Sequence, residues 1–412
     1  MTKLIEELAS RQRFGMKPGL ETITEIARRL GNPEKSFKTI HVAGTNGKGA
    51  VCAILSSVLG CGRYTSPHLV KLNERFFVDG GIIDDATLER AGERVSRVIA
   101  EMKGYDVTFF EALTAVAFLI YAENGAERVI FETGLGGRLD ATNICNTELS
   151  VITRIGLEHC DWLGDTIEKI AFEKAGIIKE GVPVVLGENS KIVRDIIEAR
   201  AKELNAPFFY APCLACESEI PLDFALKGSF NRENAVTALA ALRVLDSTGR
   251  RSMDFGCVAP DLNPLSSIHY PLHWPGRFQE VGSFIIDGAH NPPAARALVG
   301  ALGTEKVDLI CGFCADKDIA ATLRILSPNI VKGIAVKTNN PRSVSAKELA
   351  ALMNDVGIEA VSMENLSSAL QCARASSRRT LVCGSLFLAG EAVVALNAYP
   401  WVASRFDPSE KL

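Results

Sequence analysis

The sequence predicts an α/β protein of two domains, on three observations. Short β-branched runs alternate with amphipathic segments of helix length, which is typical of a mostly parallel sheet with helices on its faces. A chain of 412 residues is long enough for two or three domains. The alternation is interrupted once, at residues 261–277, where three prolines and two serines occur without periodicity. We therefore expect domains at residues 1–270 and 271–412, joined by this linker.

The expected elements follow from hydrophobic periodicity, taken in chain order. In the first domain, strands are expected at residues 38–42, 128–132, 149–155 and 182–186. Helices are expected there at residues 20–30, 47–59, 86–102, 110–124, 166–175 and 231–245. In the second domain, strands are expected at residues 281–287, 307–313, 333–337 and 381–386.

Composition and charge exclude several classes of protein. Hydrophobic residues make up 47% and charged residues 23%, which excludes a disordered chain, a collagen and a coiled coil. With 45 basic and 49 acidic side chains, the formal net charge of -4 indicates no nucleic-acid partner. No apolar run reaches the roughly 18 residues of a membrane span, and the N-terminus lacks the apolar stretch of a signal peptide. We expect a cytoplasmic protein that binds no membrane.

The eleven cysteines indicate reduced thiols, because their number is odd and no export signal accompanies them. Two CxxC pairs, Cys213/Cys216 and Cys311/Cys314, leave a zinc site as an alternative, but no histidine cluster lies near them. Cys311 belongs to the apolar run 307–313, where a thiol packed in a strand is expected. We interpret the cysteines as structural.

A glycine-rich segment between an expected strand and an expected helix predicts a phosphate-binding loop. Its glycines let backbone N–H groups converge on phosphate oxygens, the helix N-terminus adds partial positive charge, and a lysine adds a full one. The alternative is an ordinary glycine-rich turn with a solvated lysine. This segment is shorter than a strict P-loop. In a P-loop a serine or threonine follows the lysine, and this segment lacks that hydroxyl, so metal ligands must come from elsewhere. The expected binding residues are Thr45, Asn46, Gly47, Lys48, Gly49 and Ala50.

This loop, GTNGKG after an IHVAG strand, resembles the Mur ligase superfamily, in particular folylpolyglutamate synthase/dihydrofolate synthase. Seven further motifs match in order along nearly the whole chain: YTSPHL from residue 64, TFFE from 108, ETGLGGRLDATN from 132, LEH from 157, FEKAG from 172, PGRF from 275 and DGAHNP from 287. The resemblance implies a P-loop-type, Mur-ligase-like N-terminal domain with a mostly parallel sheet, and a smaller Rossmann-like α/β C-terminal domain.

The resemblance also implies ATP-dependent chemistry with two Mg²⁺ ions. It assigns Ser66 and Glu132 to magnesium, adds His159 for a second ion, and makes Lys174 a carbamylated lysine that also holds the second ion. Hard oxygen donors suit magnesium, and a strand end is where open α/β sheets place their sites. The alternatives are a capping or ion-paired Glu132, a packed loop histidine and a surface lysine. Lys48, His159 and Lys174 are the expected catalytic residues.

For the nucleotide, the resemblance assigns Arg277 to the phosphates, Asp287 to the ribose side and Asn234 to the base, with His290 lining the same site. The planar guanidinium suits phosphate, and the alternative for Arg277 is a salt bridge at the end of the linker.

For the pterin, the resemblance assigns Thr108, Phe110 and Asp140. An aromatic ring can stack on a flat heterocycle while a carboxylate pairs with its N–H donors. The alternative for Phe110 is ordinary core packing.

Two departures from the family pattern stand out. Ala50 replaces the usual Ser or Thr, and the interval from Lys48 to Ser66 is 66 − 48 = 18 residues, several fewer than usual. The deletion falls on residues 60–63, and Ser66 must still reach the metal.

The sequence thus predicts an ATP-dependent ligase that adds L-glutamate to dihydropteroate, to folate polyglutamates or to both, through an acyl phosphate. Its expected partners are the small substrates pterin or folate, L-glutamate and ATP, and we expect a monomer. Two alternatives stay open: a Mur-type ligase for another carboxylate, and a nucleotide-binding regulatory protein that has lost catalysis through Ala50 and the deletion. The intact Glu132, His159 and Lys174 count against the second alternative.

Overall fold

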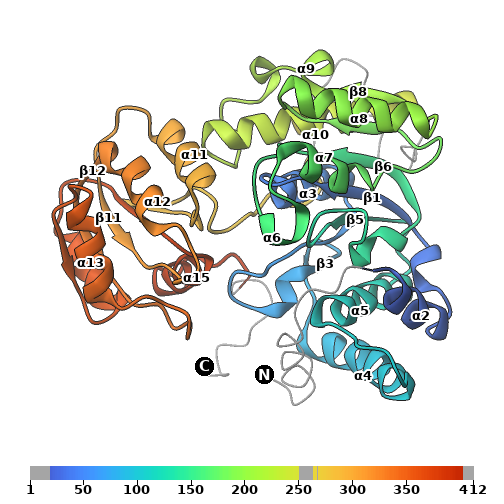
Figure 1. The fold of residues 1–412 in the computed structure, drawn as a ribbon, viewed down its shortest axis with the longest axis horizontal. Helices are drawn as coiled ribbons and strands as arrows, with labels where there is room; N and C mark the ends of the chain where they lie inside the picture. Colours follow the sequence, from blue (N-terminus) through green and yellow to red (C-terminus); the bar gives the residue numbers. More distant parts are fainter. Residues whose placement is uncertain (1–18, 250–262, 267, 402–412) are drawn as a thin grey trace. The chain divides into compact units, whose positions relative to one another are not determined.

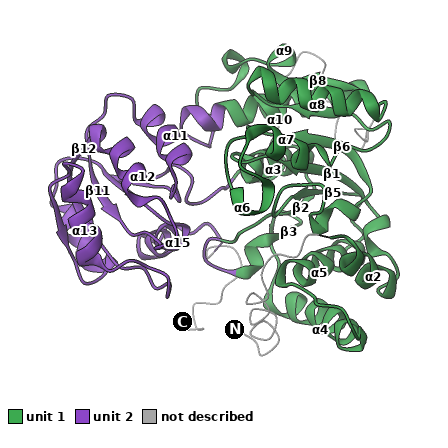
Figure 2. Cartoon of the chain, viewed as in Figure 1, with its two compact units in different colours: residues 1–68, 72–223, 233–272 green, residues 69–71, 224–232, 273–412 purple. Residues whose placement is uncertain are grey.

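The computed structural model describes residues 19–249, 263–266 and 268–401. The chain divides into two compact units, coloured separately in Figure 2. Unit 1 holds residues 1–68, 72–223 and 233–272, and unit 2 holds residues 69–71, 224–232 and 273–412. Each unit is described by itself.

Unit 1 is built on a sheet whose described strands follow the order β4-β3-β2-β5-β1-β6-β7-β8. The strands from β2 to β8 along this order run parallel, and β3 and β4 form an antiparallel edge. Their bounds are β1 Lys38–Ala43, β2 Gly62–Tyr64, β3 Phe76–Val78, β4 Gly81–Ile82, β5 Arg128–Glu132, β6 Thr147–Ile152, β7 Val184–Leu186 and β8 Phe208–Tyr210.

Two groups of helices cover parts of this sheet. One core contains buried side chains of α2, α4 and α5 packed with those of β2, β3 and β5, and α4 lies beside α5 in Figure 1. A second core joins α7 and α8 to β1, β6 and β7. The helix bounds in or entering unit 1 are α2 Glu21–Arg29, α3 Lys48–Leu59, α4 Asp85–Glu101, α5 Phe109–Glu123, α6 Cys160–Leu163, α7 Ile167–Ala175, α8 Lys191–Glu203, α9 Ala211–Leu214 and α10 Ser229–Ser247.

Unit 2 has its own sheet, with the described strands in the order β13-β12-β11-β14-β10-β9. All of them pair in parallel except β9, which is antiparallel to β10. One core packs α11, α12 and α13 against the sheet, and another packs α14 and α15. The bounds are β9 Gln279–Val281, β10 Phe284–Ile286, β11 Val307–Cys311, β12 Ile330–Ala335, β13 Ala360–Ser362, β14 Thr380–Cys383, α11 Pro292–Leu302, α12 Ile319–Leu326, α13 Ala346–Asp355, α14 Leu366–Arg374 and α15 Leu386–Ala395.

The mixed α/β class with two sheet-based units is as the sequence predicted, and the structure corrects some elements. The single strand expected at residues 281–287 is wrong: β9 and β10 form a hairpin, because Gly282 turns the chain at φ +58°. The strand expected at 381–386 ends at Cys383, and Ser385 caps α15 instead. Of the linker expected at 261–277, residues 261, 262 and 267 lie outside the described residues.

Within the described residues, no helix is long and apolar enough to cross a membrane. Cys311 is buried in β11, as expected, and the described cysteines are free thiols. Cys160, Cys213, Cys216 and Cys372 are exposed, so the structural interpretation does not extend to them.

Candidate active site

Four neighbouring parallel strands of unit 1 end in segments that carry predicted site residues. These strands lie in the order β2, β5, β1, β6, and each pairs with the next. Ser66 follows β2, Glu132 ends β5, the segment 44–47 follows β1, and His159 lies beyond β6. Open α/β sheets bind their ligands outside the carboxyl ends of the strands. The fold therefore gathers these four segments at one edge of the sheet.

The segment between β1 and α3 requires glycine at two positions. Gly44 (φ +145°) has a neighbour so close that an added Cβ would lie 1.8 Å from Thr153 Oγ1. At Gly47 (φ +88°) an added Cβ would lie 2.0 Å from Asn234 Oδ1. Asn234 is thus brought against the loop by α10, although it is far away in the sequence.

The start of α3 offers backbone donors to an anion. Gly47 is the N-cap residue and makes no side-chain capping bond. The first amides of a helix have no acceptor within the helix, so they are available to a phosphate. The Lys48 ammonium donates to the carbonyls of Gly44 (3.0 Å) and Thr45 (3.3 Å) and lies over this loop.

The other predicted loop residues divide into those that face solvent and those that hold the loop in place. Asn46 is exposed, and Thr153 Oγ1 donates to its carbonyl at 2.7 Å. The Thr45 hydroxyl donates to Gly156 O at 3.0 Å and accepts from Gly156 N at 3.0 Å. Ala50 is buried within α3. Thr45 therefore anchors the loop through its side chain rather than offering a free hydroxyl.

Ser66 and Glu132 meet despite the shortened segment that precedes Ser66. The helix α3 ends at Leu59, Gly60 caps it at φ +60°, and β2 begins two residues later. Ser66 N donates to Glu132 Oε2 at 3.0 Å, and Glu132 is 4% exposed. A serine hydroxyl and a nearly buried carboxylate are hard oxygen donors that fit a magnesium ion.

Lys174 is buried, contrary to what its place on an amphipathic helix suggests. Its side chain is 1% exposed, and Nζ donates to Gly44 O at 2.8 Å and to Glu158 Oε1 at 2.7 Å. Burial lowers the pKa of Lys174 to about 8, against the opposing effect of Glu158. The lysine therefore touches the phosphate loop directly and carries an unusually large neutral fraction near neutral pH.

Glu158 is a site residue that sequence reasoning left without a role. It holds the ammonium of Lys174 from the loop after β6. The sequence did hold one sign of this role, because Glu158 is an acid directly before His159 in the segment that follows an expected strand.

His159 itself is exposed, has φ +48° and is the N-cap residue of the short helix α6. The unmodified Lys174 ammonium cannot ligate a metal.

The three predicted pterin residues also converge. Phe110 is half-buried and lies so close to Gly134 that an added Cβ there would be 2.5 Å from its ring. The next amide, Leu135 N, donates to Asp140 Oδ2 at 2.8 Å. Thr108 is the N-cap of α5, and its N and Oγ1 both bond to the Glu111 carboxylate. The ring and the carboxylate therefore share one glycine-rich loop, and Thr108 fixes the start of the helix that carries the ring.

In unit 2, the remaining predicted residues flank the hairpin of β9 and β10: Arg277 precedes β9, and Asp287 and His290 follow β10. The Asp287 carboxylate accepts from Phe278 N and Ala289 N, both at 2.7 Å, and burial raises its pKa against the effect of Arg277. The Arg277 guanidinium donates to Gly276 O at 3.0 Å. His290 Nδ1 lies 2.8 Å from Gly288 O, and burial lowers the pKa of this imidazole. The two motifs PGRF and DGAHNP thus form one connected turn.

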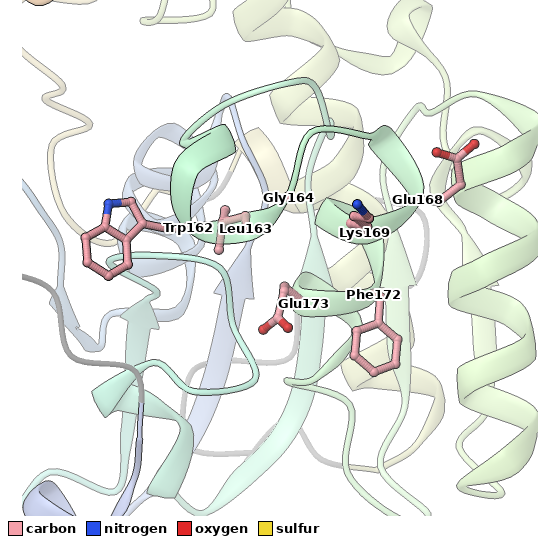
Figure 3. A pocket seen from close by; sticks show the side chains of 7 residues that line it. All are labelled: Trp162, Leu163, Gly164, Glu168, Lys169, Phe172 and Glu173. Atoms are coloured by element: carbon pink, nitrogen blue, oxygen red, sulfur yellow. The ribbon is translucent and has the colours of Figure 1, made fainter.

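Unit 1 also has a shallow pocket, formed by the stretch of chain between His159 and Lys174. It is lined from α6, α7 and the turn between them, as Figure 3 shows, by Trp162, Leu163, Gly164, Glu168, Lys169, Phe172 and Glu173. None of the predicted site residues lines it. Trp162 and Phe172 are about half exposed, at 49% and 56%.

Known proteins are similar to this chain in sequence and in fold. The family model of the Mur ligase glutamate ligase domain matches residues 276–386. A probable dihydrofolate synthetase of Schizosaccharomyces pombe is 32% identical, over 90% of this chain and 97% of its own.

Two solved structures resemble the chain over nearly its whole length. Escherichia coli FolC in complex with DHPP and ADP has a TM-score of 0.81 at 30% identity, covering 96% of this chain and 98% of that one. A bifunctional folylpolyglutamate synthase/dihydrofolate synthase with Mn, AMPPNP and L-glutamate bound has a TM-score of 0.80 at 30% identity, with the same coverage. From this identity over almost full length, the chain belongs to the folylpolyglutamate synthase/dihydrofolate synthase family of the Mur ligases.

Proposed function

We propose that the chain is an ATP-dependent ligase that joins L-glutamate to the carboxyl group of dihydropteroate, of folates or of both. The observation that carries this proposal is the contact between Lys174 Nζ and Gly44 O, at 2.8 Å. It joins the phosphate loop to the helix of the FEKAG motif, in a family whose solved members hold ADP, AMPPNP and L-glutamate.

The phosphate loop would hold and orient ATP. The uncapped amides at the start of α3 and the Lys48 ammonium can surround the transferring phosphate. Positive charge placed there before the reaction stabilises the negative charge that develops as the phosphoryl group moves to the substrate carboxylate. The resulting acyl phosphate is then open to attack by the amine of glutamate.

Magnesium would be held by Ser66 and Glu132, because the bond from the Ser66 backbone N–H to the Glu132 carboxylate already brings these two residues together beyond β2 and at the end of β5. When bound, the ion supplies charge neutralisation on the phosphates.

For a second ion, we propose His159 and a carbamylated Lys174. Carbamylation adds carbon dioxide to a neutral amine, releases one proton and leaves an anionic carbamate. The lowered pKa of Lys174, near 8, favours the neutral amine. Glu158 would then lose its cationic partner and face a second anion, and a bound divalent cation would offset this negative charge.

At the other end of the substrate, Phe110 would stack on the pterin and Asp140 would accept its N–H groups. In unit 2, Arg277 would bind the phosphates of ATP, with Asp287 on the ribose side and His290 beside them. Asn234, already against Gly47, would contact the base. We propose that the protein acts in the cytoplasm as a monomer, without nucleic acid or membrane.

The decisive measurement is ADP release by the purified chain with ATP and magnesium. Dihydropteroate and tetrahydrofolate are each supplied with and without L-glutamate, and the product mass is checked for one added glutamate. ADP release that needs both a pterin substrate and glutamate supports the ligase. Tight ATP binding with no turnover on either substrate would support the regulatory alternative instead.

A further inference from the structure

A buried chain of three polar side chains links the first strand of the sheet to the glycine-rich loop. His41 lies in β1 and is 0% exposed, as is Thr142, and Asp140 is 5% exposed. His41 Nε2 lies 2.8 Å from Thr142 Oγ1, which in turn donates to Asp140 Oδ1 at 2.5 Å. The backbone N–H of Thr142 donates to the same oxygen at 3.0 Å.

The order of the protons in this chain follows from counting donors. Thr142 has one hydroxyl proton, and it is given to Asp140. Its oxygen must therefore accept from His41, so His41 carries its proton on Nε2. Burial lowers the pKa of His41 to about 3, so the ring is neutral and donates only from that nitrogen. Within the described residues His41 Nδ1 has no hydrogen-bond partner, as expected for the unprotonated nitrogen.

These bonds fix one oxygen of Asp140 and restrict the other. Oδ1 accepts both donors of Thr142, while Oδ2 accepts from Leu135 N at 2.8 Å. Leu135 adjoins Gly134, against which the Phe110 ring packs. The plane of the carboxylate is therefore set relative to the ring that would stack on the pterin.

We infer that His41 and Thr142 are positioning residues for the pterin-bearing substrate, acting through Asp140. The inference rests on the proposed function, in which Asp140 binds the pterin. Neither side chain touches substrate: His41 supplies a proton that orients the hydroxyl of Thr142, and that hydroxyl orients the carboxylate. Without the donor on His41, the Thr142 oxygen loses the bond that holds its hydroxyl in line with Asp140, so the shortest hydrogen bond of that carboxylate is less well oriented.

The test compares isosteric and conservative variants of the full-length protein. Thr142→Val keeps the shape and removes the hydroxyl, whereas Thr142→Ser keeps the hydroxyl. We expect Thr142→Val to weaken the binding of dihydropteroate about tenfold, which is the effect of losing one hydrogen bond to a charged group. The measurements are the KM for dihydropteroate and its Kd by calorimetry. The KM for ATP and for glutamate should stay within about twofold, and Thr142→Ser should recover most of the dihydropteroate affinity.

A second pair of variants tests the first link. His41→Leu removes the donor, and His41→Gln retains an N–H at a similar reach. His41→Leu should weaken the binding of dihydropteroate, as Thr142→Val does. His41→Gln should weaken this binding less. The matched control is Thr380→Val in β14 of unit 2, a threonine that is 1% exposed and has no partner for its hydroxyl within the described residues. It should leave dihydropteroate affinity unchanged.

The outcomes separate this inference from the proposed function. A wild-type protein that binds dihydropteroate while Thr142→Val binds it equally well overturns the positioning role and leaves the ligase standing. Equal losses for all three substrates, not recovered by Thr142→Ser, also overturn it, because they indicate general destabilisation. A wild-type protein that neither binds nor uses any pterin substrate overturns the proposed function and this inference together.

Discussion

The two units each contain a strand-to-helix turn that is expected to meet ATP, and the two turns are built in opposite ways. In unit 1, β1 leads to α3, whose N-cap Gly47 makes no side-chain capping bond. In unit 2, β10 leads to α11, whose N-cap Asn291 accepts from Ala294 N at 2.9 Å. The first turn leaves its amides to an external anion, and the second satisfies them internally.

The charges of the two turns follow the same division. Lys48 places a cation over the turn of unit 1, where its ammonium donates to the backbone carbonyls of Gly44 and Thr45. Asp287 places a buried carboxylate inside the turn of unit 2, where it accepts from two backbone amides. An anion is therefore already present in the second turn. Phosphate should bind to the backbone in unit 1, whereas unit 2 can contribute only through side chains such as Arg277.

The largest expected effect is that of Lys48→Ala. Removing a fixed positive charge from the transferring phosphate should lower turnover by about 10²–10³-fold or more. The measurement is ADP release at saturating ATP and magnesium. Lys191→Ala is the matched control, because Lys191 is an exposed lysine paired with Asp195 on α8. Near wild-type turnover in Lys48→Ala would show that the turn of unit 1 does not hold the reacting phosphate.

Glu132→Gln should have the next largest effect, because only the turn of unit 1 is expected to need a metal. The amide keeps an acceptor for Ser66 N but loses the negative charge, so activity should fall about a hundredfold and require more magnesium. Glu148→Gln is the control, since Glu148 is a partly buried carboxylate of the same sheet that pairs with Arg128. A Glu132→Gln protein whose activity falls only in proportion to its unfolded fraction would exclude a ligand role.

Lys174→Ala tests whether this side chain acts as an anion. If the lysine is carbamylated, the substitution removes a negative ligand, and acetate should partly restore activity by supplying oxygen donors. Wild-type activity should fall after carbon dioxide is removed and recover with bicarbonate. Lys169→Ala is the control, because it breaks only an exposed ion pair with Asp165. This variant should lose little activity, and acetate should not change its activity. An active wild-type enzyme that is insensitive to carbon dioxide, with unmodified Lys174 in its intact mass, would contradict the carbamate.

Local features of the site could be read from the sequence, because their causes are local. The strand at residues 128–132 was predicted with the bounds that β5 has, and it carries Glu132 to the sheet edge. The hairpin of β9 and β10 was missed, because Gly282 and Ser283 interrupt an otherwise apolar run only briefly. The glycine conformation that makes the turn is visible only in the backbone.

Other features depend on contacts between distant residues, and periodicity does not show them. The burial of Lys174 comes from Gly44, 130 residues away, and from Glu158 in a loop. The link between His41 and Thr142 spans 101 residues. On its own helix Lys174 looks like any surface lysine, so only the family motif pointed to it. The pairing of Glu158 with it had no such guide.

The smallest expected effect belongs to Asn291→Ala, which tests the other side of the comparison. If Asn291 only caps α11, its loss should cost about 1 kcal/mol of local stability. Amide hydrogen exchange in the first turns of α11 should then be about fivefold faster, while the KM for ATP should stay unchanged. Asn291→Ser retains a capping oxygen and should exchange like the wild type. Weaker ATP binding by Asn291→Ala, with exchange in α11 unaltered, would mean that the Asn291 side chain serves the nucleotide instead of capping the helix. The opposition between the two turns would then be wrong, because the first turn of α11 would not be closed by the side chain of its own N-cap residue.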